Sequence, residues 1–94
     1  MNKLSATAIK ENLDLLEKGW SYSNDSIKIE FVFNDFIGAF TFMTAVAFEA
    51  EKMNHHPEWR NVYNKVEISL STHEANGVTL KDFELAAKID KLSK

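Results

Sequence analysis

The chain has 94 residues, of which 45% are apolar and 12% aromatic, with no cysteine and a formal net charge of −3. We expect residues 1–94 to form one domain, because two would each have too little chain for a core. The apolar and aromatic content excludes a disordered segment, and the lack of cysteine excludes a disulfide framework or a zinc–thiolate site.

Membrane and nucleic-acid partners are both disfavoured by the sequence. No stretch approaches the ~20 apolar residues of a membrane helix, and the N-terminal residues lack the apolar core of a secretory signal. The 11 basic residues are scattered and include one arginine, Arg60, whereas binding to a phosphate backbone needs a clustered basic face. We therefore expect a cytoplasmic protein that binds neither membranes nor, directly, nucleic acid.

The first third of the chain predicts a helix followed by a β-hairpin. Ser5 is the expected N-cap, and apolar residues spaced by four and three from Ile9 predict a helix that ends at Lys18–Gly19. The short alternation at 20–22, the turn residues at 24–26 and a period of two over 27–33 then predict two strands.

A long second helix is predicted from Asn34–Asp35 to about Met53, and it is apolar on more than one side. Its first predicted stripe is Phe36, Phe40, Met43, Ala47 and Ala50, and its second is Ile37, Thr41, Ala45 and Phe48. Such a helix must be covered on more than one side. A sheet covers one side, and either a second copy of the chain or long loops cover the other.

The remaining residues predict a second hairpin and a third helix. Alternation runs over 59–63 and 66–71. With a tight turn at Asn64–Lys65, it places Trp59, Asn61 and Tyr63 on the same face as Leu70, Ile68 and Val66. Thr79 and Asp82 resemble a capping box that opens a helix. Its expected apolar face is Phe83, Ala86, Ala87 and Ile89. Strands joined as hairpins predict an antiparallel sheet with helices on one face, an α+β domain.

The three histidines lie close to the ends of predicted elements. His55 and His56 end the second helix, and His73 ends the last strand. Three interpretations remain open: a catalytic zinc site, although no common ligand spacing is present; helix capping and loop packing; or metal-free acid–base catalysis, for which imidazole is well matched near neutral pH. Glu51, four residues before His55, is expected on the same helix face.

One long run of residues resembles the signature of the pterin-4a-carbinolamine dehydratases. The run covers residues 51–66, and its core is Glu-Lys-x-x-His-His-Pro-x-Trp, followed by Thr-His-Glu at 72–74. Residues 19–20, 36–43 and 77–79 and Asp82 also resemble the family. The resemblance spans nearly the whole chain, in order and without a large gap.

The resemblance implies a fold, an assembly and a reaction. The fold is a two-layer, four-stranded antiparallel sheet with three helices packed on one face, in agreement with the element order α-β-β-α-β-β-α. The assembly is a homodimer or homotetramer, formed through the second helix and the sheet edge. The reaction is dehydration of 4a-hydroxytetrahydrobiopterin to quinonoid dihydropterin, which recycles the pterin of aromatic amino-acid hydroxylases, with no metal or organic cofactor.

The resemblance also implies which residues form the site. Its catalytic residues are His55, His56, His73 and Glu51, with His55 and His73 in proton transfer and His56 in substrate orientation. Its substrate-binding residues are Trp20, Pro57, Thr72, Glu74 and Asp82, although capping alone accounts for Asp82. Because histidines in a cleft contribute little to core burial, we expect their substitution to leave folding almost unchanged.

Two other functions are compatible with the same residues. Animal members of the family also act as dimerisation cofactors for a homeodomain transcription factor, through the surface of the second helix. A binding role does not need the histidine cluster, which is fully present here. The other alternative is dehydration of a different pterin, including one of molybdenum-cofactor metabolism.

Overall fold

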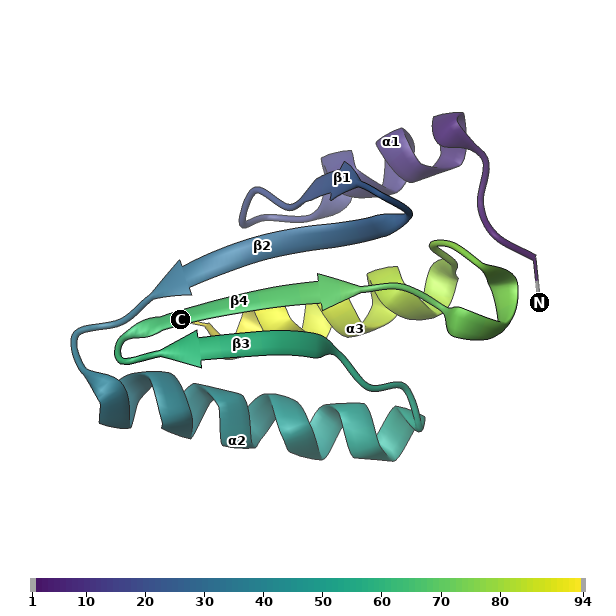
Figure 1. Ribbon diagram of the computed structural model, residues 1–94. Helices are drawn as coiled ribbons and strands as arrows, with labels where there is room; N and C mark the ends of the chain where they lie inside the picture. Colours follow the sequence, from purple (N-terminus) through teal and green to yellow (C-terminus); the bar gives the residue numbers. More distant parts are fainter. Residues whose placement is uncertain (1, 94) are drawn as a thin grey trace.

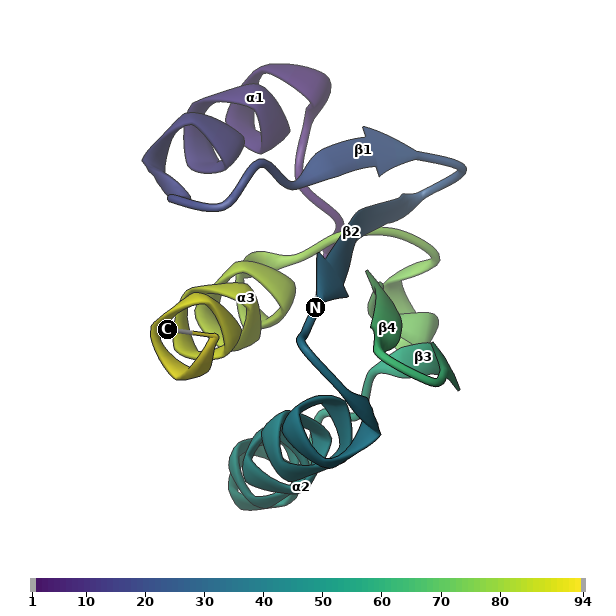
Figure 2. The same cartoon turned by 90° about the vertical axis from the view of Figure 1, so that its left-hand side faces the viewer.

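The computed structural model describes residues 2–93. Its elements are α1 (Ala6–Leu15), β1 (Ser21–Ser23), β2 (Ser26–Val32), α2 (Phe36–Met53), β3 (Glu58–Val62), β4 (Lys65–Leu70), the short 3-10 helix η1 (His73–Ala75) and α3 (Leu80–Leu92). The strands form one antiparallel sheet in the order β1-β2-β4-β3. All three α-helices lie on one face of this sheet, with α3 between α1 and α2 (Figure 2). The predicted α+β class and element order are therefore confirmed.

The central strand β4 supplies the middle of the core. Val66, Ile68 and Leu70 are buried and alternate with residues on the open face of the sheet. Ile68 pairs with Ile29 of β2 on one side and with Trp59 of β3 on the other. The predicted period of two is therefore confirmed, because one face of the sheet packs on helices.

The β3–β4 turn lies one residue earlier than predicted. Val62 pairs with Lys65, so the turn residues are Tyr63 and Asn64 rather than Asn64 and Lys65. Asn64 is fixed in the turn because its side chain donates to the Phe33 carbonyl at 2.9 Å and its own carbonyl accepts from the Phe33 amide at 2.8 Å. Moving the turn by one residue shifts the register by two, so Trp59 and Asn61 keep their predicted face. Tyr63 is instead an exposed turn residue.

Helix α2 has the predicted ends but a different buried face. Asp35 caps it by accepting from the Gly38 amide at 2.7 Å. The first predicted stripe is right only at Ala50 and, in part, at Met43, since the buried residues are Ala39, Phe42, Val46 and Ala50. The row that contains Phe42 faces the sheet because the Phe42 ring packs on Phe31 and Phe33, with ring centroids 5.1 and 5.0 Å apart. Four large apolar side chains of α2 are left exposed: Phe36, Ile37, Phe40 and Phe48.

Helices α1 and α3 each differ from the prediction in one respect. Ser5 caps α1 as predicted, but the helix ends at Leu15 instead of Lys18–Gly19. It ends early because Leu16 is extended and the Glu17 amide donates to Asp90 of α3 at 3.1 Å. The capping box of α3 is confirmed. On α3, Leu85 is buried in place of the predicted Ala87, because a helix between two others buries a broad band of its surface.

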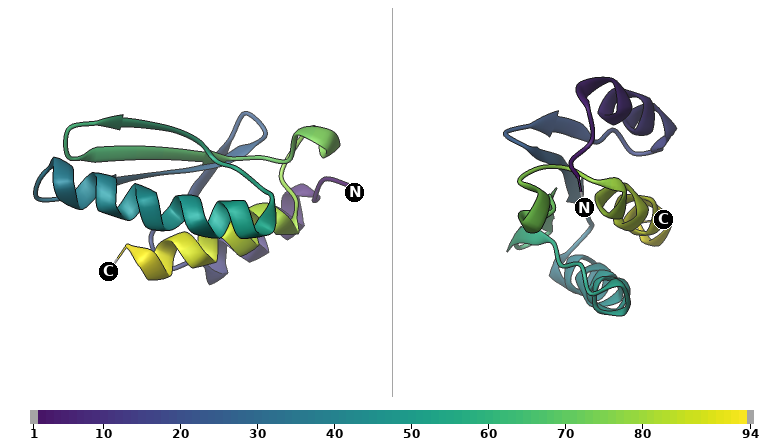
Figure 3. Two further views of the ribbon diagram at one scale, coloured as in Figure 1. Left: turned by 90° about the horizontal axis from the view of Figure 1, so that it is seen from below. Right: turned by 90° about the vertical axis from the view of Figure 1, so that its right-hand side faces the viewer.

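The elements that carry the histidines meet at one end of the sheet. The end of α2, the end of β4, η1 and the start of α3 lie together there (Figures 1 and 3). Among residues 2–93, no helix combines the length and the apolar character that crossing a membrane requires.

Candidate active site

Asn54 ends α2 and sets the direction of the two histidines that follow. Its backbone is left-handed, with φ 52° and ψ 42°, and its amide donates to the Ala50 and Glu51 carbonyls. The His55 amide also donates to the Ala50 carbonyl, at 3.0 Å. A left-handed residue of this kind reverses the chain and satisfies the last carbonyls of a helix. His55 is thereby buried, while His56 remains exposed.

The buried carboxylate of Asp82 holds the His55 ring. Nε2 of His55 lies 2.5 Å from Oδ1 of Asp82, whose exposed fraction is 0%. The second oxygen, Oδ2, accepts from the Thr72 hydroxyl and from the Thr79 amide, both at 2.9 Å. A buried carboxylate is stable only where such donors replace water. Asp82 therefore positions His55 as well as capping α3.

Two threonine hydroxyl groups form a chain of hydrogen bonds that ends at Asp82. The Thr72 and Thr79 hydroxyl oxygens are 2.7 Å apart. Because each hydroxyl has one proton and Thr72 donates its own to Asp82, Thr79 must donate to Thr72. A carboxylate in this position requires the proton of a neutral His55 ring to sit on Nε2. Its other nitrogen, Nδ1, has no protein partner in residues 2–93 and is not enclosed.

One cavity of about 430 Å³ contains all three histidines. Its lining residues are Asn54, His55, His56, Ser71, Thr72, His73, Glu74 and Lys81. The expected meeting of the histidines is thus found, although His56 and His73 are far apart in the chain. Its charged groups are one carboxylate, Glu74, and one ammonium, Lys81. Such a polar, partly open cavity suits a small heterocyclic ligand with several hydrogen-bonding atoms.

Glu51 contacts His56, although the helical spacing predicts that it shares a face with His55. Its Oε1 lies 2.9 Å from Nε2 of His56, and both side chains are exposed. Glu51 and His55 do not share a helix face, because α2 ends at Met53 and His55 no longer follows the helical spacing. Glu51 does not line the cavity and contacts it only through His56.

Trp20 and Pro57 do not line the cavity, contrary to expectation. The Trp20 ring is buried, and its Nε1 donates to Oδ1 of Asp90 at 2.7 Å. Asp90 follows Asp82 by eight residues on α3, which is about 12 Å along the helix. Pro57 is half-buried and lies outside the lining. Of the other expected binding residues, Thr72 and Glu74 do line it.

Three lining residues were not expected from the sequence. Asn54 precedes the histidine pair. Asparagine readily adopts the left-handed conformation that ends a helix, so its position could indicate where the chain turns toward the cavity. Ser71 follows β4, and the strand alternation predicts only that it faces away from the core. Lys81 lies within the Thr79–Asp82 capping box. This motif predicts the start of a helix and gives no indication of a cavity.

Among residues 2–93, no group of three or more His, Cys, Asp or Glu side chains is placed to hold a metal ion. The Nε2 atoms of His55 and His56 each lie against a carboxylate oxygen instead. The arrangement fits proton transfer by side chains.

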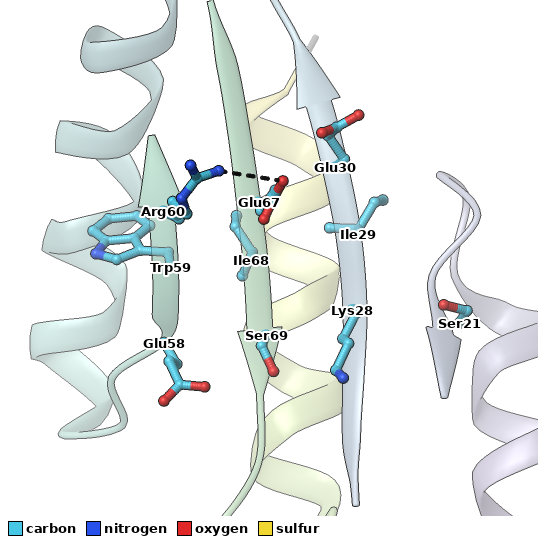
Figure 4. Close-up of a pocket in the computed structure, with 10 residues that line it drawn as sticks. All are labelled: Ser21, Lys28, Ile29, Glu30, Glu58, Trp59, Arg60, Glu67, Ile68 and Ser69. Carbon is cyan, nitrogen blue, oxygen red and sulfur yellow. Dashed lines mark ion pairs between the residues drawn. The ribbon is translucent and has the colours of Figure 1, made fainter. Parts of the chain in front are cut away.

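A larger hollow of about 630 Å³ lies over the open face of the sheet (Figure 4). Its charged side chains come from β2, β3 and β4, and Arg60 forms an ion pair with Glu67 at 3.8 Å. It contains no histidine. We take the smaller cavity as the candidate site because it alone brings the three imidazoles together.

The chain matches a known protein family over nearly its whole length. A model of the family described as "Pterin 4 alpha carbinolamine dehydratase" matches residues 2–92. A relative from Rhizobium meliloti (strain 1021) is 58% identical over 91 residues, which cover 95% of this chain and 86% of the relative. Another, from Christiangramia forsetii (strain DSM 17595 / CGMCC 1.15422 / KT0803), is 53% identical over 92 residues, covering 98% and 94%. Both carry the name "Putative pterin-4-alpha-carbinolamine dehydratase".

Two solved structures share the fold. A crystal structure of a transcriptional coactivator/pterin dehydratase from Brucella melitensis is 40% identical with a TM-score of 0.95, covering 99% of this chain and 100% of that one. A pterin dehydratase-like RuBisCO assembly factor of the alpha-carboxysome is 20% identical with a TM-score of 0.66, covering 80% and 87%, and shows the fold alone. From the family match and the close relatives, the chain belongs to the pterin-4a-carbinolamine dehydratases, a family named for a hydro-lyase activity.

Proposed function

We propose that this chain dehydrates 4a-hydroxytetrahydrobiopterin to quinonoid dihydropterin and water, and so recycles the pterin of aromatic amino-acid hydroxylases in the cytoplasm. The observation that carries the proposal is the single cavity with three histidines, one of them held by a buried carboxylate. Family membership supplies the reaction class.

The reaction needs one proton donor and one proton acceptor. The bond between C4a and the hydroxyl oxygen breaks, and the hydroxyl leaves as water with one added proton. N5 loses its proton, and a double bond forms between N5 and C4a. No electrons are gained or lost overall, so positioned acid and base groups supply what the reaction requires.

His55 is the proposed base. Its Nδ1 is free to accept the N5 proton, because Nε2 is occupied by Asp82. The imidazolium that then forms lies against a carboxylate, which stabilises it at the moment of proton transfer. His73, at the start of η1, is the proposed acid for the 4a-hydroxyl. Its ring is exposed and has no partner among the described residues, so it exchanges protons with water between turnovers.

His56 and the carboxylates around the cavity have a proposed role in binding. The Nε2 atom of His56 is engaged by Glu51, which fixes the ring orientation. A fixed ring suits substrate orientation better than proton exchange with water. Glu74 lines the same cavity and presents a carboxylate to the amino and ring N–H groups that a pterin carries.

The test compares catalysed with spontaneous dehydration of 4a-hydroxytetrahydrobiopterin. We expect the intact chain to accelerate the reaction, and His55→Ala and His73→Ala each to slow turnover by about tenfold to ten-thousandfold. His56→Ala should act mainly on KM, and Lys10→Ala on the exposed surface of α1 is the control. Full activity in both His55→Ala and His73→Ala would contradict the assignment.

The exposed row of α2 favours a second role in assembly. Phe36, Ile37, Phe40 and Phe48 leave a large apolar surface in contact with water, which is unusual for a monomer. We propose that this surface binds α2 of a second copy of the chain. The Brucella melitensis relative is named as a coactivator as well as a dehydratase, and a heterologous partner on this row is the alternative.

A further inference from the structure

The loop that carries His73 and Glu74 is held at its base. Within the loop, η1 is a single turn in which the Ala75 amide donates to the Thr72 carbonyl at 3.0 Å. The Asn76 amide donates to the His73 carbonyl at 3.1 Å. The side chains of His73 and Glu74 are exposed and line the cavity. Their position therefore depends on the residues where the loop begins and ends.

Thr72 and Gly77 form the base of this loop as an isolated antiparallel pair. The Thr72 amide donates to the Gly77 carbonyl at 2.8 Å, and the Gly77 amide donates to the Thr72 carbonyl at 3.4 Å. The Thr72 hydroxyl also donates to Asp82, which fixes the first side of the base. Gly77 has no side chain, so the second side is held by backbone hydrogen bonds and by the chain that packs over it.

Residues 3–4, called here the N-terminal segment, pack over the second side of the base. The Leu4 amide donates to the carbonyl of the buried Val78 at 2.8 Å, and the Leu4 side chain packs against the core. The side chain of Lys3 lies against Gly77. Figures 1 and 3 show the start of the chain beside the loop that contains η1. The N-terminal segment thus joins the start of α1 to the base of the loop that carries His73.

The contact between Lys3 and Gly77 leaves no room for a side chain at position 77. A methyl group there would lie 2.9 Å from Cδ of Lys3 and 3.1 Å from its Cβ, whereas carbon atoms in contact lie about 3.5–4.0 Å apart. Cδ can rotate away, but Cβ is bonded to the backbone, so the N-terminal segment itself must move. Gly77 does not have the positive φ that favours glycine. The close approach of Lys3 is therefore the structural reason for a glycine here.

We infer that the N-terminal segment positions His73 for proton transfer, and that it does so through Gly77 and Val78. This inference rests on the proposed dehydratase function and deepens it, because it adds positioning residues that lie outside the cavity lining. A general acid must lie within hydrogen-bond reach of the atom that it protonates. A misplacement of about 1 Å can cost about a hundredfold in rate, so a smaller shift at the base of the loop should have a smaller but measurable effect.

A compensating pair of substitutions tests the inference. We expect Gly77→Ala to lower kcat for 4a-hydroxytetrahydrobiopterin by about three- to tenfold, with KM within about twofold of the unmodified chain. Lys3→Gly removes the atoms that the new methyl group meets. The double variant should therefore regain a kcat within about twofold of Lys3→Gly alone, because residues in direct contact have non-additive effects.

Gly38→Ala is the matched control. It makes the same substitution near the start of α2, where the new methyl group would lie 3.3 Å from Oδ1 of Asp35 and 3.5 Å from Cβ of Phe33. Gly38 does not line the cavity. Its substitution should leave kcat within about twofold of the unmodified chain.

NMR spectroscopy follows the loop without turnover. The chain has three histidines, and the spectrum of His73→Ala identifies the His73 ring signals. We expect Gly77→Ala to move these signals and to speed hydrogen exchange of the Leu4 amide by about tenfold, because its bond to Val78 is weakened. Lys3→Gly in the same chain should return the His73 signals toward their positions in Lys3→Gly alone.

The outcomes separate this inference from the dehydratase proposal. An equal loss of kcat in Gly77→Ala and in the double variant would overturn the inference, because the loss would then arise at Gly77 itself. Unchanged kcat in Gly77→Ala would also overturn it. No turnover by the unmodified chain, with His73 signals that move and recover as expected, would overturn the dehydratase proposal and leave the positioning of His73 intact. No turnover and unmoved His73 signals would overturn both.

Discussion

His55 and Asp82 form a buried pair that joins the end of α2 to the start of α3, with Nε2 and Oδ1 2.5 Å apart. The same carboxylate caps α3 and accepts from Thr72 at the end of β4. One side chain thus connects three separate elements of the fold. The pair fixes both the position and the proton arrangement of the imidazole that faces the cavity.

We expect Asp82→Asn to lower kcat by about a hundred- to ten-thousandfold and to change KM much less. The amide has no negative charge to stabilise an imidazolium, and its NH₂ group can force the His55 proton from Nε2 to Nδ1. Steady-state kinetics with 4a-hydroxytetrahydrobiopterin measures the split between kcat and KM.

Asp90→Asn is the matched control for this substitution. Asp90 is a second buried carboxylate on α3, but it lies outside the cavity and binds Trp20 and Glu17. Its substitution should lower stability and leave kcat within about twofold of the unmodified chain. An equal fall in kcat for both variants would show that Asp82 acts only through folding.

The histidines should differ in their effect on stability. His55 is buried against Asp82, so His55→Ala leaves an unpaired buried carboxylate and should cost about 3 kcal/mol of unfolding free energy. His73 is exposed, and His73→Ala should change stability by no more than about 0.5 kcal/mol. Chemical denaturation of both variants measures the difference.

This difference revises the expectation that cleft histidines leave folding unchanged. We expect little change for His73→Ala but a loss for His55→Ala, because His55 is buried against Asp82, a contact that no local pattern in the sequence indicates. Equal unfolding free energies for His55→Ala and the unmodified chain would mean that Asp82 finds water or another donor in its place.

Local signals in the sequence predict most of the fold. The caps at Ser5 and Asp35, the Thr79–Asp82 capping box and the period of two in the strands each depend on neighbouring residues. The three histidines also stand at element ends, which explains why their meeting at one cavity could be anticipated.

Long-range contacts account for what the sequence did not predict. Trp20 binds Asp90, 70 residues away, and no local pattern indicates that pairing. The early end of α1 depends on the same carboxylate. The sequence does not predict the buried face of α2, because nearly every side of this helix is apolar. The face that lies against the sheet is the one on which Phe42 packs on Phe31 and Phe33.

Trp20→Phe should act on stability and not on substrate binding. The substitution removes the indole N–H that donates to Oδ1 of Asp90 and leaves this buried oxygen without that donor. We expect a loss of about 1–3 kcal/mol in unfolding free energy, with KM within about twofold of the unmodified chain. A raised KM at unchanged stability would show instead that Trp20 takes part in substrate binding.

Removal of metal ions should leave the proposed activity intact. Nε2 of His55 and Nε2 of His56 each lie against a carboxylate oxygen. The proposed catalysis uses proton transfer by imidazole rings and no metal ion. We expect full dehydratase activity after exhaustive chelation, and less than one equivalent of zinc in purified protein by elemental analysis. Activity lost on chelation and restored by zinc would contradict the assignment.

The exposed apolar row of α2 should hold the oligomer together. The exposed fractions are 74% for Ile37 and 67% for Phe48. The Thr44 hydroxyl beside them donates to the Phe40 carbonyl of the same helix at 2.9 Å, so this polar group is already paired within α2. Contact with the same row of a second copy would remove these side chains from water. We expect the unmodified chain to have the mass of a dimer or tetramer by light scattering at micromolar concentration.

Phe48→Glu should lower that oligomer order, because it would bring like charges into an apolar contact and leave them without water. Leu15→Glu is the matched control: Leu15 is exposed by 79% but lies on α1, away from the row. It adds the same charge and should leave the mass unchanged. A monomeric mass for the unmodified chain, or an unchanged oligomer in Phe48→Glu, would show that α2 is not the contact surface.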